Sequence, residues 1–354
     1  MTTSRLISFE QAYASLTDFD CIIDVRSPAE FAEDHIPGAI NCPVLNNEER
    51  IQVGTLYKQV SPFEAKKVGA ALVAKNIGNH IEQNFLDKPK DWKPLIYCWR
   101  GGNRSGSMTH IMAKIGWHAM QLDGGYKGFR RFVNQQLPDL AEAANWVVLC
   151  GETGTGKSRL LQCLESQGAQ VIDLEKLAQH RGSVLGKLPE NGQPSQKYFE
   201  TEIWRNLSRF DFNKPIFVEA ESKKVGNLRV PDTMMEKMRQ SKCIQLQLAM
   251  EERIALLRDD YRHFIEDTTL LGAQLGCLID LHGKETIKRW STLAESNQIT
   301  ELIQQLLLQH YDPAYQKAIA RNFELIDLAK SYVVNDKSDA SYQMLAKQIL
   351  QEYY

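Results

Sequence analysis

One stretch of the chain combines a cysteine, two arginines and a glycine pair in a pattern that could activate sulfur. Its residues are Cys98, Arg100, Gly101, Gly102, Arg104 and Ser105. Apolar residues precede the cysteine and a helical pattern follows, so the loop turns from a strand into a helix. Such a turn points backbone N–H groups inward, and the helix adds its positive end. Both effects favour a nucleophilic thiolate or a bound anion. The alternative is a structural cysteine that ends a core strand.

A second stretch has the spacing of a phosphate-binding loop. Its residues are Gly151, Glu152, Thr153, Gly154, Thr155, Gly156, Lys157 and Ser158, which match GxxxxGK[ST] in full. The glycines let backbone N–H groups wrap phosphate oxygens, Lys157 neutralises charge, and Ser158 can reach a metal ion. An apolar run precedes the motif and a helical pattern follows it. The sequence therefore predicts a diphosphate site, which need not serve a nucleotide.

The acidic partner of this loop is less standard. Glu219 follows an apolar run and Glu221 stands two residues later, where nucleotide-hydrolysing P-loop proteins usually carry aspartate. Either glutamate is a candidate Mg²⁺ ligand or base. ATP hydrolysis therefore does not follow from the motif alone.

The elements that must position both loops alternate between strand and helix. Strands are expected at residues 21–25, 94–98, 118–122, 146–150, 170–173, 215–220, 242–248 and 332–334. Helices are expected from Ser27, from Ser61 to about Asn76, and over 105–115 and 157–167, with a mostly helical region over 251–328. The alternation predicts α/β domains with mostly parallel sheets. The polar stretch 135–145 lacks a strand signal, so we expect domains over 1–137 and 138–354, the second with helical C-terminal additions.

Composition narrows the classes of protein and partner. The 354 residues include 43% hydrophobic and 24% charged residues, which suits two globular domains. A net charge of -2 provides no global positive field, so an RNA would need a local basic patch. The seven cysteines are widely spaced without a CxxC pair, which argues against a disulfide framework or a zinc site. No apolar stretch approaches membrane-spanning length, so we expect a cytoplasmic protein with no membrane contact.

The N-terminal part resembles the rhodanese family. The resemblance rests on DVRSPAEF at residues 24–31, DHIPGAIN at 34–41 and the Gly124-Gly125 pair. It implies a rhodanese-like domain in which Cys98 carries the transferred chalcogen. Five residues separate Cys98 from Arg104, one more than is typical of rhodanese loops, and cysteine-dependent phosphatases share this longer loop. The length fits a phosphatase, with Asp123 as candidate acid, or a phosphate-bearing selenium donor.

Nearly the whole chain is similar to the tRNA 2-selenouridine synthase family. The more specific segments are ER at 49–50, VGTLYKQ at 53–59, SPFEA at 61–65, GGYK at 124–127, HRGS at 180–183, QKYFE at 196–200 and EAES at 219–222. The resemblance implies exchange of sulfur for selenium in wobble-position 2-thiouridine of tRNA. It also implies selenophosphate as donor and an S-geranyl intermediate made from geranyl diphosphate, with no tightly bound cofactor.

Under this resemblance, the P-loop would cradle the diphosphate and the Cys98 loop would bind or deliver the selenium donor. A selenophosphate-producing enzyme is a candidate partner. The candidate tRNA contacts share positive charge or an aromatic ring: Tyr126, Lys127, Arg130, Arg131, Arg181, Lys223, Lys224 and Arg229. The alternatives are a sulfurtransferase or cysteine phosphatase fused to an ATP-dependent P-loop kinase or ATPase, and an RNA-binding protein without activity.

Overall fold

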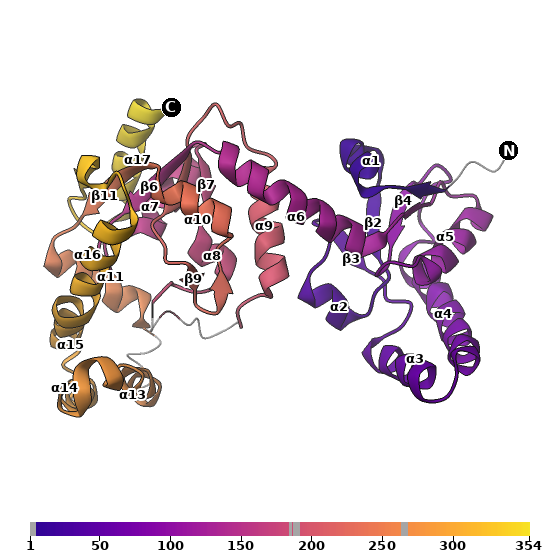
Figure 1. The fold of residues 1–354 in the computed structure, drawn as a ribbon, viewed down its shortest axis with the longest axis horizontal. Coiled ribbons are helices and arrows are strands. Elements are labelled where there is room, and N and C mark those ends of the chain that lie inside the picture. The colour runs from indigo at the N-terminus through magenta and orange to yellow at the C-terminus, as the bar shows by residue number, and fades with distance from the viewer. Residues whose placement is uncertain (1–4, 184–185, 187–191, 263–267) are drawn as a thin grey trace. The chain divides into compact units, whose positions relative to one another are not determined.

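The computed structural model describes residues 5–183, 186, 192–262 and 268–354 (Figure 1). Contacts divide the chain into two compact units, Met1–Leu137 and Pro138–Tyr354. The boundary falls inside a helix, α6 (Gly125–Ala143), which the polar residues around Pro138 did not predict. Each unit has its own parallel sheet, so the two are described separately.

The first unit is built on a five-stranded parallel sheet in the order β1-β5-β4-β2-β3. Its strands are β1 (Leu6–Ile7), β2 (Cys21–Asp24), β3 (Ala39–Asn41), β4 (Pro94–Tyr97) and β5 (Met120–Leu122). Its helices are α1 (Phe9–Ala14), α2 (Pro28–Glu33), α3 (Asn47–Gln59), α4 (Pro62–Asn84), α5 (Asn103–Ile115) and the start of α6. The fully buried β4 is the middle strand, and the Cys98 loop follows its carboxyl end.

A buried ion pair ties β2 to the rest of this unit. Arg26 Nη2 lies 2.6 Å from Asp24 Oδ2, and the two side chains are 1% and 0% exposed. The same Nη2 donates to the Asp34 carbonyl at 2.6 Å. The Arg26 guanidinium also lies 4.0 Å from the centre of the Tyr126 ring in α6. One arginine therefore joins β2, the segment before β3, and α6.

Replacing Arg26 with leucine should destabilise the first unit by about 3–5 kcal/mol, because it leaves the Asp24 carboxylate buried without its partner. Urea unfolding of the full chain measures this loss. The control is Lys67→Ala, which removes an exposed ion pair with Glu64 (2.8 Å) and should cost less than about 1 kcal/mol. Equal losses of unfolding free energy in the two variants would contradict a special role for Arg26.

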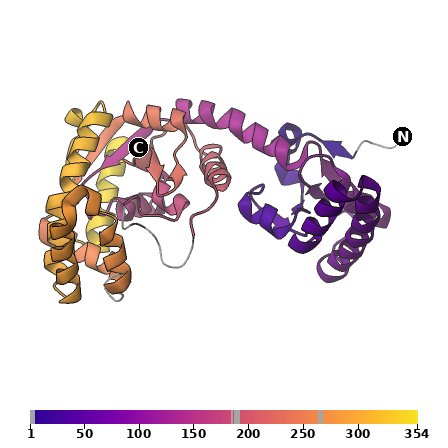
Figure 2. The same ribbon diagram turned by 60° about the horizontal axis from the view of Figure 1, so that its bottom comes forward.

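The second unit has a five-stranded parallel sheet in the order β12-β11-β6-β8-β7. Figure 2 shows its ribbon, coloured from magenta to yellow, from a second side. Its strands are β6 (Trp146–Cys150), β7 (Gln170–Ile172), β8 (Ile216–Glu219), β11 (Lys242–Gln247) and β12 (Lys330–Val333), beside a small antiparallel pair, β9 (Lys224–Val225) and β10 (Leu228–Arg229). The middle strand, β6, leads into the P-loop. Apolar residues of this sheet, of α7 (Lys157–Ser166) and of α17 (Asp339–Tyr353) form its core.

Further helices complete this unit. They are α8 (Leu174–Ala178), α9 (Gln196–Leu207), α10 (Asp232–Arg239), α11 (Met250–Asp260), α13 (Thr268–Gly276), α14 (Ile279–Glu295), α15 (Ile299–Leu306) and α16 (Asp312–Asn322), with a π-helical turn at Leu307–Tyr311. Among the residues that the structure describes, no helix has the length and hydropathy needed to cross a bilayer.

The predicted α/β class with parallel sheets and a helical C-terminal part is confirmed. Every predicted strand is present within a few residues of its expected bounds. The helix from Ser61 is longer than predicted and ends at Asn84, since apolar residues such as Ile77 continue its buried face. Several elements were not predicted: the short strands β1, β3, β9 and β10, and the helices α1, α3, α6, α8, α9, α10 and α17.

Candidate active sites

The Cys98 loop turns directly from β4 into α5. Cys98 is 4% exposed, and the Ser105 hydroxyl from the first turn of α5 donates to its Sγ at 3.3 Å. Gly102 precedes the helix with φ +76°, a backbone conformation that favours glycine. Gln121 Nε2 from β5 donates to the Gly102 carbonyl at 3.2 Å. The sulfur is therefore held at the positive end of α5.

The Gly124-Gly125 turn supports this loop. The backbone N–H of Tyr126 donates to the Cys98 carbonyl at 2.8 Å, and that of Lys127 to the Trp99 carbonyl at 3.0 Å. A Cβ at Gly125 would lie 2.4 Å from the Cys98 carbonyl oxygen, and Gly125 has φ +52°. The close approach of these two backbones therefore requires glycine.

The two arginines of the loop have different surroundings. Arg104 donates to both carboxylate oxygens of Glu30, at 2.8 and 3.3 Å. Burial raises the pKa of Glu30, but the Arg104 hydrogen bond and charge outweigh it, so the net pKa is lowered. The Glu30 carboxylate thus neutralises much of the positive charge of Arg104 that was expected beside the thiol. Arg100 is exposed and pairs with no carboxylate of the described residues, which leaves it available to an anion.

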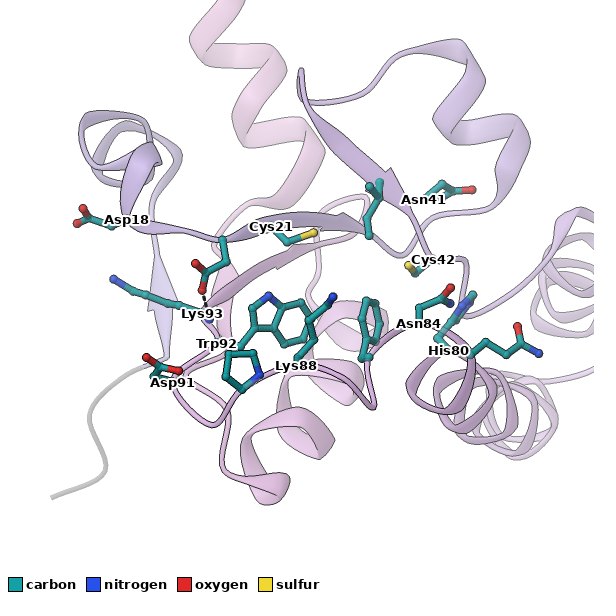
Figure 3. A pocket seen from close by; sticks show the side chains of 15 residues that line it. Asp18, Cys21, Asn41, Cys42, His80, Asn84, Lys88, Asp91, Trp92 and Lys93 are labelled. Carbon is teal, nitrogen blue, oxygen red and sulfur yellow. Dashed lines mark hydrogen bonds between the residues drawn. The ribbon is translucent and has the colours of Figure 1, made fainter.

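A cavity of about 1000 Å³ in the first unit lies away from Cys98, at the amino ends of β2 and β4. Figure 3 shows Cys21, Cys42, His80 and Trp92 around it. Burial, with smaller contributions from Cys21 and Asp24, raises the pKa of the Cys42 thiol to about 12. Cys42 is therefore a neutral thiol at physiological pH and a poor nucleophile.

The P-loop of the second unit makes the same kind of turn, from β6 into α7. Gly156 precedes the helix with φ +77°, and a Cβ there would lie 2.1 Å from the Tyr342 hydroxyl. Lys157 Nζ donates to the Gly151 carbonyl at 2.7 Å, so the ammonium lies within the loop. The loop thus has the glycine conformation and the cation that a bound diphosphate needs.

A buried arginine from a distant helix holds one side of the P-loop. Arg253 of α11 is 3% exposed and donates to the Thr153 carbonyl at 2.9 Å and to Glu152 Oε2 at 2.8 Å. Its Nη2 also lies 2.6 Å from Asp312 Oδ1 in α16. No local pattern marks Arg253, because its partners are 59 to 101 residues away.

Two tyrosines complete this support. The Tyr315 hydroxyl of α16 accepts a hydrogen bond from the Gly151 N–H. The buried Tyr342 hydroxyl of α17 donates to the Thr155 carbonyl at 3.1 Å. The C-terminal helices are therefore part of the phosphate site, although they stand outside the motif that revealed it.

Carboxylates gather beside Lys157 and Ser158. Glu219 ends β8, is 1% exposed, and accepts the Glu175 N–H at 2.8 Å. Burial, reinforced by neighbouring carboxylates, raises its pKa well above the usual range, and the side chain is almost closed to solvent. Burial, followed by the charge of Glu175, raises the pKa of the half-buried Glu221 to about 8. Glu221 lines the cavity described next, as does Glu175, which was not predicted.

A cavity of about 740 Å³ opens above the P-loop. Its polar end includes Lys157, Ser158, Glu175, Arg181 and Glu221, and its apolar side includes Leu257, Tyr261, Tyr311, Ile319 and Phe323. A smaller apolar pocket shares Leu257, Tyr261 and Tyr311 with it and continues among Leu271, Ile299, Leu302 and Leu306. Diphosphate-binding groups and apolar surface therefore meet in one place.

Two predicted tRNA contacts are corrected by burial. Tyr126 is 3% exposed, and its hydroxyl donates to Asp34 Oδ2 at 2.8 Å. Arg130 is 9% exposed and lies 3.7 Å from the same carboxylate. Asp34 is itself fully buried, so both side chains belong to the interior of the first unit. Neither is placed to meet an RNA.

The remaining predicted tRNA contacts are scattered. Lys127 and Arg131 are exposed on α6, whereas Lys223, Lys224 and Arg229 are exposed around β9 and β10. Arg229 and Lys223 lie 2.9 and 3.9 Å from Asp232, which offsets part of their charge. Arg181 lies in the P-loop cavity, 4.7 Å from the centre of the Tyr261 ring.

These features define a class: a rhodanese-like domain joined to a P-loop domain. The rhodanese-like family model matches residues 8–132, and the model of the tRNA 2-selenouridine synthase AAA domain matches residues 144–276. Relatives described as tRNA 2-selenouridine synthase share 36% identity in Nitrosomonas europaea, 32% in Alcanivorax borkumensis and 30% in Nitrosomonas eutropha. The alignments cover 68%, 85% and 98% of this chain, and 63%, 90% and 90% of the relatives.

The chain therefore belongs to the tRNA 2-selenouridine synthase family. It spans just under two thirds of the Nitrosomonas europaea relative in that alignment. Membership favours this family's chemistry over the kinase, ATPase and phosphatase alternatives.

The pH dependence of diphosphate binding should report on Glu221. As the pH rises through about 8, this carboxyl ionises and opposes a bound anion, so the affinity for inorganic pyrophosphate should fall. A nearby unit charge should weaken binding about tenfold (~1.4 kcal/mol). Calorimetry between pH 6.5 and 9 measures the change.

The matched control is Glu221→Gln, which cannot ionise. Because pyrophosphate itself titrates, the ratio of the wild-type to the Glu221→Gln dissociation constant isolates the contribution of residue 221. A constant ratio across this pH range would show that Glu221 does not face the bound diphosphate.

Proposed function

We propose that the protein exchanges the 2-sulfur of wobble-position 2-thiouridine in tRNA for selenium, with selenophosphate as donor and an S-geranyl intermediate. Membership in the family supports the overall exchange. The observation that carries the geranyl step is the P-loop cavity, in which phosphate-binding groups adjoin apolar surface. A prenyl diphosphate carries both a diphosphate group and an apolar chain in one molecule.

In the first step, the sulfur of the base attacks C1 of geranyl diphosphate. The carbon–oxygen bond breaks, diphosphate leaves, and the base loses its N3 proton to solvent. The P-loop N–H groups and Lys157 stabilise the charge that develops on the leaving group. The apolar side of the cavity, around Leu257 and Tyr261, receives the geranyl chain.

Ser158 and Glu175 are the residues that fit a Mg²⁺ ion at this site. The Ser158 hydroxyl donates to Glu175 Oε2 at 2.7 Å, beside the Lys157 ammonium. Magnesium prefers oxygen ligands and keeps several waters, so two protein oxygens and a diphosphate are enough to hold it. When bound, the ion would neutralise part of the diphosphate charge.

In the second step, the Cys98 loop holds selenophosphate. Backbone N–H groups at the start of α5 and the exposed Arg100 bind its phosphate oxygens. The Cys98 sulfur at the floor of the loop contacts the donor and orients its selenium toward the base, so selenium entry requires Cys98. Selenium attacks C2 of the S-geranyl base, the carbon–sulfur bond breaks, and geranylthiol leaves. Water then cleaves the phosphorus–selenium bond, which releases phosphate and leaves 2-selenouridine. Alkylation helps because a thiol leaves more readily than the original thiocarbonyl sulfur.

Single substitutions should separate the two steps. Lys157→Ala should slow geranylation about 100-fold or more, because it removes a charge that stabilises the leaving group. Cys98→Ser should allow geranylation but block selenium entry. Mass spectrometry of nucleosides from 2-thiouridine tRNA, incubated with geranyl diphosphate and selenophosphate, distinguishes the products.

The matched controls are Lys347→Ala and Cys277→Ser, which alter exposed residues outside both sites. Both should retain wild-type rates. If the wild-type protein transfers neither geranyl nor selenium to the base, the proposed function is wrong.

A further inference from the structure

Helices α3 and α4 form a hairpin in the first unit (Figure 1). Many of its side chains are exposed. No residue of α3 is buried, and the helix packs on α4 at points such as Val53, which lies beside Gly69. A surface helix normally buries an apolar stripe. In α3, Val53 and Leu56 are only partly buried, and the fold of this unit alone does not account for the exposed Ile51 and Tyr57.

Large apolar side chains are exposed along this hairpin. Ile51, Tyr57, Val60 and Phe63 are 68%, 57%, 64% and 67% exposed. Isolated exposed apolar residues are common, but four between residues 51 and 63 mark an interaction surface. Two of them carry aromatic rings that could stack on unpaired bases.

The same segment is positively charged. Residues 50–67 contain Arg50, Lys58, Lys66 and Lys67 but only one acid, Glu64, so their net charge is +3. Glu48 and Glu49 in the first turn of α3 reduce it to +1 over residues 48–67, in a chain whose net charge is -2. Lys67 pairs with Glu64, whereas Lys58 and Lys66 are exposed without an ion pair to any described residue. A local cationic surface with exposed aromatic rings complements single-stranded RNA.

A groove beside α3 has Glu30, an ion-pair partner of the Cys98 loop, in its wall. It has a volume of about 570 Å³ and is lined by Glu30, Arg50, Ile51, Gly54, Thr55, Lys58 and Gln59. Glu30 is the carboxylate that Arg104 of the Cys98 loop holds at 2.8 Å. Arg50 Nε lies 3.9 Å from the same carboxylate. A strand of RNA in this groove would therefore lie one ion pair away from the Cys98 loop.

We propose that the α3–α4 hairpin is a docking surface for an unpaired segment of the substrate tRNA. Lys58 and Lys66 contact its phosphates, and Tyr57 and Phe63 stack on its bases. This assignment rests on the proposed function, in which tRNA is the substrate. It replaces the role predicted for Tyr126 and Arg130, which are buried.

Binding of 2-thiouridine tRNA to the full chain, followed by fluorescence anisotropy at 50–200 mM salt, tests the proposal. Lys58→Gln/Lys66→Gln should reduce the slope of log affinity against log salt by about 1.4, at roughly 0.7 for each lost phosphate contact. Tyr57→Ala/Phe63→Ala should weaken binding about tenfold or more and leave that slope unchanged. Tyr57→Phe/Phe63→Tyr keeps both rings and should retain wild-type affinity.

The matched control is Lys90→Gln/Lys114→Gln, which removes two exposed lysines elsewhere in the first unit and should bind as wild type. Unchanged circular dichroism and pyrophosphate binding would show that each variant is folded. If the hairpin variants bind tRNA as tightly as the wild type, the docking surface is overturned. The same conclusion follows if these variants keep tRNA binding but lose binding to another protein. If the docking surface is overturned but the wild-type protein modifies tRNA, the proposed function stands. If the wild-type protein neither binds nor modifies tRNA, the proposed function and the docking surface both fail.

Discussion

Both candidate sites depend on one constraint of backbone geometry: a middle strand of a parallel sheet must turn at once into a helix. Gly102 and Gly156 make this turn in the two units, with φ +76° and +77°. A residue with a side chain rarely adopts this conformation. The turn points backbone N–H groups and the positive helix end at the space above the sheet. A thiol stands at one such place and a phosphate-binding lysine at the other.

The two units hold their turns in different ways. In the first unit, the Gly125 turn packs against the Cys98 carbonyl, and the buried Arg26 of the Asp24–Arg26 pair lies against the ring of the next residue, Tyr126. In the second unit, the support comes from C-terminal helices through Arg253 and Tyr342. These helices also supply the apolar surface beside the P-loop. Holding the loop and enclosing an apolar substrate are therefore tasks of the same elements.

The features that depend on short stretches of sequence were predicted correctly. The strands, the turn glycines and the two motifs are short patterns, so the fold class and the location of both loops could be predicted. Pairings between distant residues could not. Tyr126 and Arg130 looked like surface groups until the structure placed the buried Asp34 beside them. Glu175 carried a weak signal, because it follows β7 at the carboxyl edge of the sheet, where parallel strands place their functional residues.

Buried charge also changed the expected chemistry of the P-loop acids. Glu219 stands where a metal-binding or basic carboxylate was predicted, but it is almost fully buried, and burial among other carboxylates raises its pKa. Glu175 and Glu221 line the cavity instead. Spacing along the chain located this group of acids. Only their burial and mutual distances separate a structural carboxyl from one that can meet a ligand.

In the proposed division of labour, the P-loop serves only to alkylate sulfur and the Cys98 loop serves selenium entry. A direct measurement supplies tRNA that is already S-geranylated, with selenophosphate and no geranyl diphosphate, to the Lys157→Ala variant. We expect 2-selenouridine at the wild-type rate with Lys157→Ala, and none with Cys98→Ser. Failure of Lys157→Ala on this substrate would show that the P-loop is needed for selenium entry, which would contradict the division between the two sites.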